Sequence, residues 1–292
     1  MKILLSRFAG SALLAGTALA QPPQATAQQN FDNVQIRTHP VAGSVYYLEG
    51  QGGNIGLSVG EDGVVMIDDQ FAPLTDRILA AIRQLNNGEI RFLINTHVHG
   101  DHTGGNENLG RMGILILARD EVRVRLAASE RPDEALPALT FRDAITIHLN
   151  GEEVRTFPVP PAHTDGDSFI HFVDSDVVHA GDVFRTTAFP YIDTANGGTL
   201  QGTLDALAIL IGMSGPDTKI IPGHGGVSTR QDVIAFRDMI LDVVAKVRPM
   251  VARGMTYEQV AASNPTATYA SRGYGDPERF LRAVYSELGG GQ

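Results

Sequence analysis

The sequence contains no cysteine. This absence excludes a disulfide framework and thiolate metal ligands, so any metal ion must be held by histidine and carboxylate side chains. An oxidising compartment would also find no thiol to attack. The 292 residues are 43% hydrophobic, which is enough for a globular protein with a substantial core and excludes disorder as the main state.

Basic residues are scarce: 23 Lys and Arg stand against 33 Asp and Glu, a net charge of -10. Residues 1–20 hold two of these cations and no acid, so their removal would leave 21 against 33, a net charge of -12. This charge disfavours a polyanionic partner, and we predict that the protein binds no nucleic acid. Because long apolar runs are missing beyond the N-terminus, we also expect no membrane attachment after that region is removed.

Residues 1–20 have the features of an export signal. Lys2 and Arg7 accompany an apolar stretch from Phe8 to Leu19, and Ala18-Leu19-Ala20 has the small-x-small form that a signal peptidase cleaves. A second such site, Ala25-Thr26-Ala27, leaves two possible cuts. An uncleaved anchor is the alternative, but the apolar stretch is shorter than the ~20 residues that span a bilayer. We therefore expect a periplasmic or secreted protein.

The rest of the chain predicts one α+β domain. Residues 21–40 are expected to be a disordered or extended segment, and no Ser/Gly-rich linker interrupts the chain between Asn30 and Gly289, which places a single domain at 41–289. Runs of strands interrupted by single helices predict two mixed β-sheets packed face to face, with helices on their outer surfaces. The expected helices span 75–85, 121–131, 203–211, 233–251 and 278–288, and the clearest strands span 92–95, 114–117, 144–149, 154–159, 168–173, 177–180 and 219–221.

The segment Asn95–Asn106 carries the strongest chemical signal. His97, His99, Asp101 and His102 fall close together after a predicted buried strand. Residues two apart in an extended segment project to the same side, so His97 and His99 can converge on one metal ion. Asp101 and His102 come from the turn beyond and can face a second ion. The alternative is a polar loop with scattered histidines, which this density disfavours.

Three further ligand candidates each follow a predicted strand and lie beside glycine or another small residue: His163, Asp182 and His224. Singly each is weak, because a lone loop histidine more often makes a hydrogen bond or lies on the surface. Together with the first cluster they complete the coordination that two zinc ions require. The remaining histidines lack this context: His39, His148, His171 and His179. Of these, His171 and His179 lie in predicted strands and are interpreted as packing or surface residues.

These residues resemble the metallo-β-lactamase superfamily, whose signature is a His-x-His-x-Asp-His run followed by a His, an Asp and a final His. The resemblance covers roughly residues 41–225 and implies a four-layer αβ/βα sandwich with two zinc ions at one edge of the sheets. It implies one ion at His97, His99 and His163, a second at Asp101, His102 and His224, and Asp182 between them. Iron or manganese is a possible substitute, because a carboxylate bridge is harder than a thiolate.

The same resemblance implies that Asp68, at the end of an apolar strand, orients a ligand histidine. The alternative is a strand-end cap.

Two more residues would contact substrate. Arg185 stands where many β-lactamases carry a lysine that binds the substrate carboxylate, and Asn196 resembles a residue that polarises the lactam carbonyl. An exposed loop cation and a turn residue are the respective alternatives. Gly50–Asn54 would be a flap over the site or a hairpin turn.

The implied activity is hydrolysis of a carbonyl bond in a small-molecule substrate by a metal-bound hydroxide, with Asp101 moving a proton. A β-lactam amide is the leading substrate, since export places the protein where such antibiotics act, and antibiotic resistance would follow. Aspartate at 182, where one group of zinc β-lactamases has cysteine, favours a thioester or lactone hydrolase of the glyoxalase II type as the alternative. A nuclease of the superfamily is disfavoured by charge and export, and a periplasmic metal- or ligand-binding protein is the non-enzyme alternative.

Overall fold

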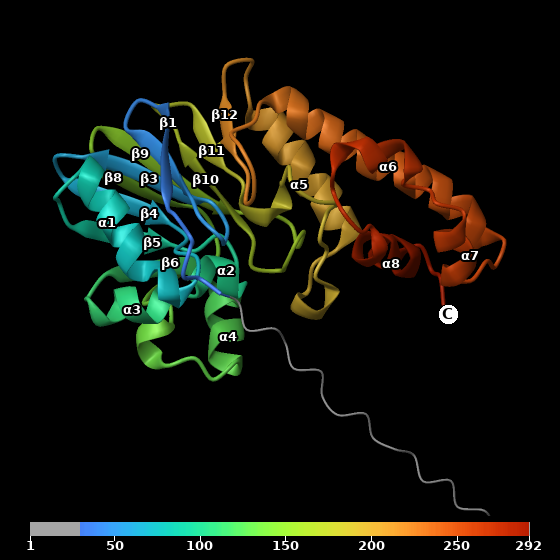
Figure 1. The fold of residues 1–292 in the computed structure, drawn as a ribbon, viewed down its shortest axis with the longest axis horizontal. Coiled ribbons are helices and arrows are strands. Elements are labelled where there is room, and N and C mark those ends of the chain that lie inside the picture. The colour runs from blue at the N-terminus through green and yellow to red at the C-terminus, as the bar shows by residue number, and fades with distance from the viewer. Residues whose placement is uncertain (1–29, 292) are drawn as a thin grey trace, which may run out of the picture. The chain divides into compact units, whose positions relative to one another are not determined.

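The structure is a computed structural model that describes residues 30–291 (Figure 1). The predicted export signal at 1–20, its cleavage sites and the tail up to residue 29 lie outside the described residues. Within the described part of the chain, no helix has the length and apolar character needed to traverse a bilayer.

The first sheet has seven strands in the order β1-β2-β3-β4-β5-β6-β7. Neighbours are antiparallel from β1 to β4 and parallel from β4 to β7. Its strands are β1 (Arg37–Ala42), β2 (Val45–Glu49), β3 (Ile55–Gly60), β4 (Gly63–Ile67), β5 (Ile90–Ile94), β6 (Leu115–Arg119) and β7 (Leu139–Phe141).

The second sheet has five strands in the order β12-β11-β10-β9-β8. Only β11 and β12 are parallel, and the other neighbours are antiparallel. Its strands are β8 (Ile145–Leu149), β9 (Glu152–Pro158), β10 (Ser168–Phe172), β11 (Val177–His179) and β12 (Lys219–Ile221).

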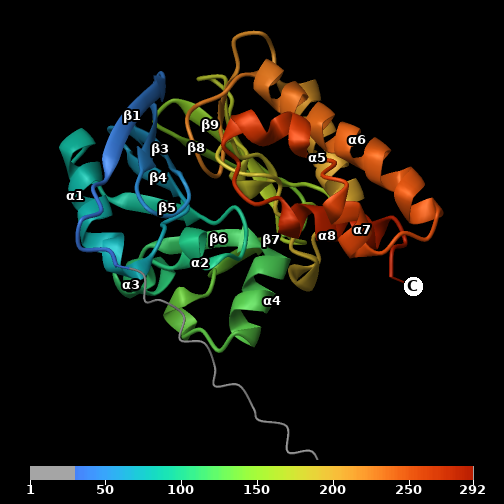
Figure 2. The same ribbon diagram turned by 45° about the vertical axis from the view of Figure 1, so that its right-hand side comes forward.

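Helices cover the outer faces of the two sheets (Figures 1 and 2). α1 and α3 lie beside the first sheet, and α5, α6 and α8 lie beside the second. The α-helices are α1 (Thr75–Leu85), α2 (Gly100–Thr103), α3 (Asn106–Arg111), α4 (Asp120–Ala128), α5 (Leu200–Met213), α6 (Arg230–Ala252), α7 (Tyr257–Ala262) and α8 (Glu278–Glu287). The 3-10 helices are η1 (Ala72–Leu74), η2 (Asp133–Ala135), η3 (Gly181–Val183), η4 (Thr194–Asn196) and η5 (Ala267–Arg272).

β4 shows how the sequence produces these layers. All five of its residues are buried, because alternate side chains enter different cores. Val65 and Ile67 join a core between the sheets that also holds Ile170 and Phe172 of β10. Val64 and Met66 join a second core against α1. A third core lies between the second sheet and α5, α6 and α8. The predicted four-layer α+β sandwich is confirmed.

The boundaries of several predicted elements are close to the observed ones. α1 spans the expected 75–85, and a capping box at Thr256 and Gln259 opens α7. The first strand and β7 were not predicted. Both are edge strands. β7 has only three residues, too few for a pattern to stand out, and β1 lacks regular alternation and contains Pro40, which an edge tolerates.

The compact unit begins at Phe31, earlier than the domain start predicted at residue 41. Two contacts hold residues 31–40 against the rest of the domain. Arg77 on α1 donates to the carbonyl of Val34 at 2.9 Å, and the rings of Phe31 and Phe71 lie 5.1 Å apart. Tertiary contacts of this kind leave no local pattern in the sequence, and composition alone therefore assigned residues 31–40 to the tail.

Replacing Phe236 tests the third core. Phe236 is 2% exposed on α6 and its ring meets that of Phe184 at 5.3 Å. Because Phe236→Ala leaves a cavity, we expect it to lower the free energy of unfolding by about 3–5 kcal/mol, measured by circular dichroism in urea. The matched control is Leu241→Ala on the same helix, where Leu241 is 45% exposed, with an expected loss within about 0.5 kcal/mol. Equal losses in both variants would contradict the assigned core.

Candidate metal centre

The candidate ligands follow the ends of strands. β5 ends at Ile94 and leads into the His97–His102 loop. His163 lies between β9 and β10, Asp182 lies in η3 after β11, and His224 follows β12. Because β11 and β12 are parallel, their carboxyl ends deliver Asp182 and His224 to the same edge of the sandwich.

The His97–His102 loop is closed by a pair of buried amides. Asn95 donates to Asn106 at 3.0 Å, and Asn106 donates back at 2.9 Å. The carbonyl of His102 also accepts a hydrogen bond from the backbone of Asp69 at 2.9 Å. These contacts fix the ends of the loop against β4 and α3, which holds the ligand side chains in place before any ion binds.

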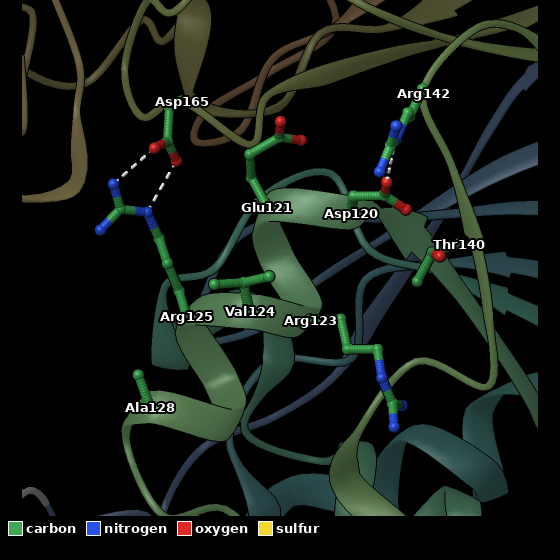
Figure 3. Close-up of a pocket in the computed structure, with 9 residues that line it drawn as sticks. All are labelled: Asp120, Glu121, Arg123, Val124, Arg125, Ala128, Thr140, Arg142 and Asp165. Atoms are coloured by element: carbon green, nitrogen blue, oxygen red, sulfur yellow. Dashed lines mark hydrogen bonds and ion pairs between the residues drawn. The ribbon is translucent and has the colours of Figure 1, made fainter.

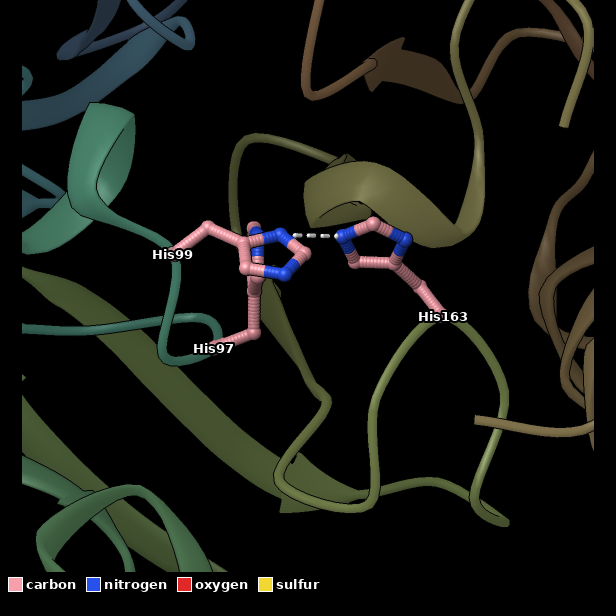
Figure 4. A group of neighbouring side chains, drawn as sticks. All are labelled: His97, His99 and His163. Atoms are coloured by element: carbon pink, nitrogen blue, oxygen red, sulfur yellow. Dashed lines mark hydrogen bonds between the residues drawn. The ribbon is translucent and has the colours of Figure 1, made fainter. Parts of the chain in front are cut away.

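The seven candidate ligands come together in the structure. Their donor atoms form three overlapping groups, each within 4.8 Å: His97, His99 and His163; His97, His102 and Asp182; and Asp101, His102 and His224. Figure 4 shows the first group, with the rings of His99 and His163 joined by a dashed line and the side chain of His97 on the His99 side. The grouping matches the two sets expected from the sequence, with Asp182 shared.

Asp182 lies between the two sets. Its Oδ1 is 3.3 Å from Nε2 of His102 and 3.3 Å from Nε2 of His224, and its Oδ2 is 3.8 Å from Nε2 of His163. Oδ2 of Asp101 lies 3.2 Å from Nε2 of His224. The side chain of Asp101 is 30% exposed and that of Asp182 is 5% exposed, so Asp101 is the carboxylate that can face a solvent-borne molecule.

His97 and His102 are oriented by hydrogen bonds on their outer ring nitrogens, which are the nitrogens that face away from the cluster of candidate ligands. Thr96 donates its hydroxyl to Asp68 at 2.7 Å, so its oxygen accepts from Nδ1 of His97 at 2.9 Å. Asp68 also accepts from Nδ1 of His102 at 2.7 Å. With Nδ1 protonated, Nε2 of each ring presents a lone pair to the cluster. The predicted role of Asp68 in orienting a ligand histidine is confirmed by this contact.

His99 and His163 are held in the same way. Nε2 of His99 lies 2.7 Å from a carboxylate oxygen of Asp193, and Nδ1 of His163 lies 2.6 Å from the carbonyl oxygen of Tyr191. Their inner nitrogens, Nδ1 of His99 and Nε2 of His163, are 2.8 Å apart. Because both outer nitrogens donate to oxygen, both inner nitrogens carry lone pairs, and only a cation or a shared proton relieves their repulsion.

Buried atoms without partners test whether a metal fits. Within residues 30–291, Nε2 of His97, Nε2 of His102 and Oδ1 of Asp182 are buried and have no hydrogen-bond partner. Burying such atoms unpaired is costly, and native proteins avoid it. All three atoms belong to the overlapping groups. The donor set therefore fits divalent cations, and imidazole with carboxylate suits zinc, iron or manganese.

The protonation of the two sets differs. Burial holds the pKa of His97 well below its usual range and lowers the pKa of His163 to about 4. Burial would also lower the pKa of His102 and His224, but the charge of Asp182 and the hydrogen bonds to neighbouring carboxylates together outweigh it and raise both. Burial opposes ionisation of Asp101, but its hydrogen bond with His224 and the charges of His102 and His224 together lower its pKa to about 2.

Close backbone approach leaves room only for glycine at two points of the site. A Cβ at Gly53 would overlap the ring of His102, and one at Gly223 would overlap Oδ1 of Asp182. The loop Gly50–Asn54 joins β2 to β3, and Asn54 donates to the carbonyls of Pro222 and Gly225 at 2.8 and 2.7 Å. These bonds favour the hairpin-turn interpretation of this loop over a mobile flap.

The two residues predicted to contact substrate differ in their surroundings. Arg185 lies beside the centre, with Nη1 3.5 Å from Oδ2 of Asp182. Asn196 is engaged within the protein: it donates to Asp193 at 2.6 Å and accepts from Arg125 at 3.0 Å. Arg125 in turn holds Asp165 (Figure 3). Asn196 is thus bonded to the residue that holds His99, and its contact with substrate stays a prediction.

The sequence reasoning missed three residues that orient ligands: Thr96, Tyr191 and Asp193. Thr96 and Asp193 act through their side chains, and Tyr191 acts through its backbone carbonyl and by stacking on His99 at 5.6 Å. The adjacency of Thr96 to His97 was a signal that could have been used. His179, interpreted as a packing or surface residue, is fully buried and lies 3.0 Å from the carbonyl of Asn54, so the packing alternative holds.

The family model described as the metallo-beta-lactamase superfamily matches residues 48–224, more than half of the chain. The chain belongs to the metallo-β-lactamase superfamily. The match includes the seven candidate ligands and ends at His224, so α6, α7 and α8 lie outside it. For this superfamily member, metal binding by the His/Asp cluster is the expected property of the fold.

Relatives of this superfamily member have varied names. The coenzyme F420H₂ oxidase of Methanothermobacter thermautotrophicus is 27% identical over 150 residues, which cover 48% of this chain and 36% of the oxidase. The metallo-beta-lactamase from Pontibacter korlensis is 16% identical with a TM-score of 0.64, covering 71% of this chain and 100% of that one. A double mutant of the sec-alkyl sulfatase PisA1 is 17% identical with a TM-score of 0.68, covering 88% of this chain and 51% of that one. At these identities the two solved structures show a shared fold.

Neutralising Asp68 tests the outer hydrogen bonds. Asp68→Asn removes the charge that holds Nδ1 of His102, so we expect the zinc affinity to fall by about 10–100-fold, measured by competition with a chelator of known affinity. Asp76→Asn, on the exposed face of α1, is the matched control and should leave the affinity unchanged. A folded Asp68→Asn protein with the affinity of the wild type would show that this contact does not orient the ligand.

Acid should remove the two ions in order. The pKa values of His102 and His224 are raised, so protons compete with a cation for these two rings as the pH falls through those pKa values. The pKa values of His97 and His163 are lowered, so these two rings stay neutral until the pH approaches the pKa of His163, about 4. We expect the ion at His102 and His224 to be lost first as the pH is lowered, and the ion at His97 and His163 only near pH 4, measured as bound zinc by elemental analysis after gel filtration. His224→Ala should hold one ion down to that pH. Simultaneous loss of both ions would contradict the assignment.

Proposed function

We propose that this superfamily member is a binuclear metal-dependent hydrolase that cleaves a carbonyl bond in a small molecule. One observation supports the proposal most strongly: four histidines have their outer nitrogens bonded to protein oxygens while their inner nitrogens face a common space with Asp182. Within residues 30–291, Nε2 of His97, Nε2 of His102 and Oδ1 of Asp182 have no hydrogen-bond partner, so their lone pairs are available to cations. The proposal assigns two ions per chain, zinc by preference, with iron or manganese as possible substitutes.

Two divalent cations, when bound, supply an activated water molecule near neutral pH and polarise the carbonyl under attack. The chain's own groups then act around them. Asp101 is ionised at neutral pH because its pKa is about 2, so its carboxylate accepts a proton and cannot begin as the donor. Its Oδ2 faces His224, which leaves Oδ1 to take the proton and return it to the leaving atom. Arg185 binds an anionic group of the substrate.

A β-lactam amide is the leading substrate in this proposal. Arg185 beside the centre supports it, and so does the proposed export of the protein to the periplasm or the medium, where such antibiotics act. A thioester or lactone is the second candidate, and the specific observation that favours it is Asp182, whose hard carboxylate occupies the position of the cysteine of one group of zinc β-lactamases. Antibiotic resistance follows only from the first candidate.

A small hydrolase panel separates these candidates. The zinc-loaded protein without residues 1–20 is assayed with nitrocefin, imipenem and S-lactoylglutathione under the same conditions. We expect turnover of at least one substrate, with the lactams preferred. Brisk thioester cleavage without lactam turnover would reject the β-lactam assignment and keep the hydrolase. No turnover of any panel member would count against the proposed function.

His97→Ala distinguishes a hydrolase from a metal-binding protein. Because His97 belongs to two of the three donor groups, its loss should reduce kcat/KM for the preferred substrate by at least about 1000-fold. His148→Ala, on β8 in the second sheet, is the control and should retain activity. Residual turnover in His97→Ala equal to that of the wild type would show that the measured hydrolysis does not depend on this centre.

A further inference from the structure

Asp193 connects two of the candidate ligands. Its Oδ2 lies 2.7 Å from Nε2 of His99, and its backbone nitrogen donates to the carbonyl of His163 at 2.9 Å. The side chain of Asp193 is 8% exposed, so protein groups rather than bulk water must fix its angle. The amide of Asn196 does so, because its Nδ2 donates to Oδ2 of Asp193 at 2.6 Å.

The direction of the Asn196 amide is set by a residue from another part of the chain. An amide has an oxygen that accepts and a nitrogen that donates, and a rotation of the side chain exchanges the two. Arg125 decides between these orientations, because Nη1 of its guanidinium donates to Oδ1 of Asn196 at 3.0 Å. A guanidinium can only donate, so the amide oxygen must face Arg125 and the amide nitrogen must face Asp193.

These residues form a chain of hydrogen bonds with a single polarity. Arg125 donates to Asn196, and Asn196 donates to Asp193. The carboxylate of Asp193 only accepts, so it requires a proton on Nε2 of His99. The lone pair of His99 then lies on Nδ1, the nitrogen that faces Nε2 of His163 at 2.8 Å. With the amide reversed, two oxygens would meet, and their repulsion would displace the acceptor that holds His99.

Arg125 is itself held in one orientation. Its Nε donates to Oδ1 of Asp165 at 2.6 Å, and its Nη2 donates to Oδ2 of the same carboxylate (Figure 3). This bidentate pairing uses one edge of the guanidinium and leaves Nη1 for Asn196. The backbone of Asp165 also donates to the carbonyl of Asn196 at 2.9 Å. Arg125 and Asp165 therefore hold the side chain and the backbone of Asn196 together.

The chain of hydrogen bonds joins elements of the two sheets. Arg125 lies on α4, which follows β6 of the first sheet, and His99 lies in the loop after β5 of the same sheet. Asp165 lies between β9 and β10 of the second sheet, and Asp193 and Asn196 lie between η3 and α5. Arg125 therefore fixes loops of the second sheet against a helix of the first, at the point where Asp193 meets His99.

We propose that Arg125 is a positioning residue for the metal centre. It sets the Asn196 amide, and this amide holds Asp193 at the angle that fixes the tautomer of His99. The proposal rests on the metal centre of the proposed function and is independent of the bond that is cleaved. A role through charge alone would have the opposite effect, because removing a positive charge favours a cation bound nearby. A loss of metal affinity on removal of Arg125 therefore reports orientation.

Zinc affinity, measured by competition with a chelator of known affinity, tests the proposal. The measurement uses the His224→Ala background, which should keep only the ion of the His97, His99 and His163 set. We expect Arg125→Gln to weaken zinc binding about tenfold and Asp193→Asn to weaken it about 10–100-fold. The two substitutions combined should cost no more than Asp193→Asn alone, because Arg125 acts through Asp193.

Arg142→Gln is the matched control. Arg142 lines the same cleft as Arg125 and pairs with Asp120 at 2.6 Å, so this variant also removes one cation and breaks one ion pair (Figure 3). It should leave zinc affinity unchanged. Unchanged or tighter zinc binding in Arg125→Gln, or losses that add in the combined variant, would overturn the positioning role.

Cobalt(II) bound in the same background gives a second measurement, because its visible absorption depends on the arrangement of its ligands. Arg125→Gln should change this absorption and Arg142→Gln should not. Asn196→Ala breaks the chain of hydrogen bonds at its next member and should reproduce the loss of affinity and the spectral change, which keeps the test decisive where Arg125→Gln does not fold. An unchanged spectrum with a less stable metal-free protein would show that Arg125 has only a structural role.

These measurements separate the positioning role from the proposed hydrolysis. Weaker zinc binding in Arg125→Gln, without turnover of any panel substrate by the wild type, would support the positioning role while the proposed function fails. Turnover by the wild type with equal zinc affinity in Arg125→Gln and its parent would support the proposed function and overturn the positioning role.

Discussion

The hydrogen bond on the outer nitrogen of four of the five candidate ligand histidines, His97, His99, His102 and His163, is the interaction on which the site depends. It selects the tautomer, sets the angle of the ring and turns a lone pair toward the cluster. Four such bonds end on groups of the protein itself, namely a hydroxyl, two carboxylates and a carbonyl, contributed by Thr96, Asp68, Asp193 and Tyr191. Without them the rings would rotate and the buried nitrogens would find protein partners instead of a cation.

The fold supplies these acceptors from both sheets. Asp68 follows β4 and has a positive φ of 60°, a conformation that a non-glycine residue adopts at some cost and that turns its carboxylate toward Thr96 and His102. Asp193 and Tyr191 come from the loop between η3 and α5, which follows the second sheet. Because the sheets pack through one core of alternating side chains, the two sets of acceptors keep a fixed relation, and with them the two halves of the donor set.

Much of this site could be predicted from the sequence, and the limits have physical reasons. The run from His97 to His102 and the three later ligands are dense, distinctive residue types at strand ends, so local patterns identify them. Asp68 was expected as an orienting residue and lies 2.7 Å from His102. Tyr191 contributes a backbone carbonyl, which every residue type has, and no sequence pattern could single it out. Asn196 was interpreted as a substrate contact because its loop resembles one in β-lactamases, but its amide is bonded to Asp193 and Arg125, two partners that only the folded chain brings together.

The fold could likewise be predicted where local sequence patterns are strong and could not where they are weak. Buried strands and amphipathic helices have strong periodicity and were predicted close to their observed bounds, whereas the edge strands β1 and β7 have little.

The central claim is that this scaffold positions two cations with Asp182 between them. Anomalous diffraction at the zinc edge from crystals of the metal-loaded protein tests it most directly. The account predicts two peaks, one among His97, His99 and His163 and one among Asp101, His102 and His224; a single peak, or peaks away from these residues, would contradict it.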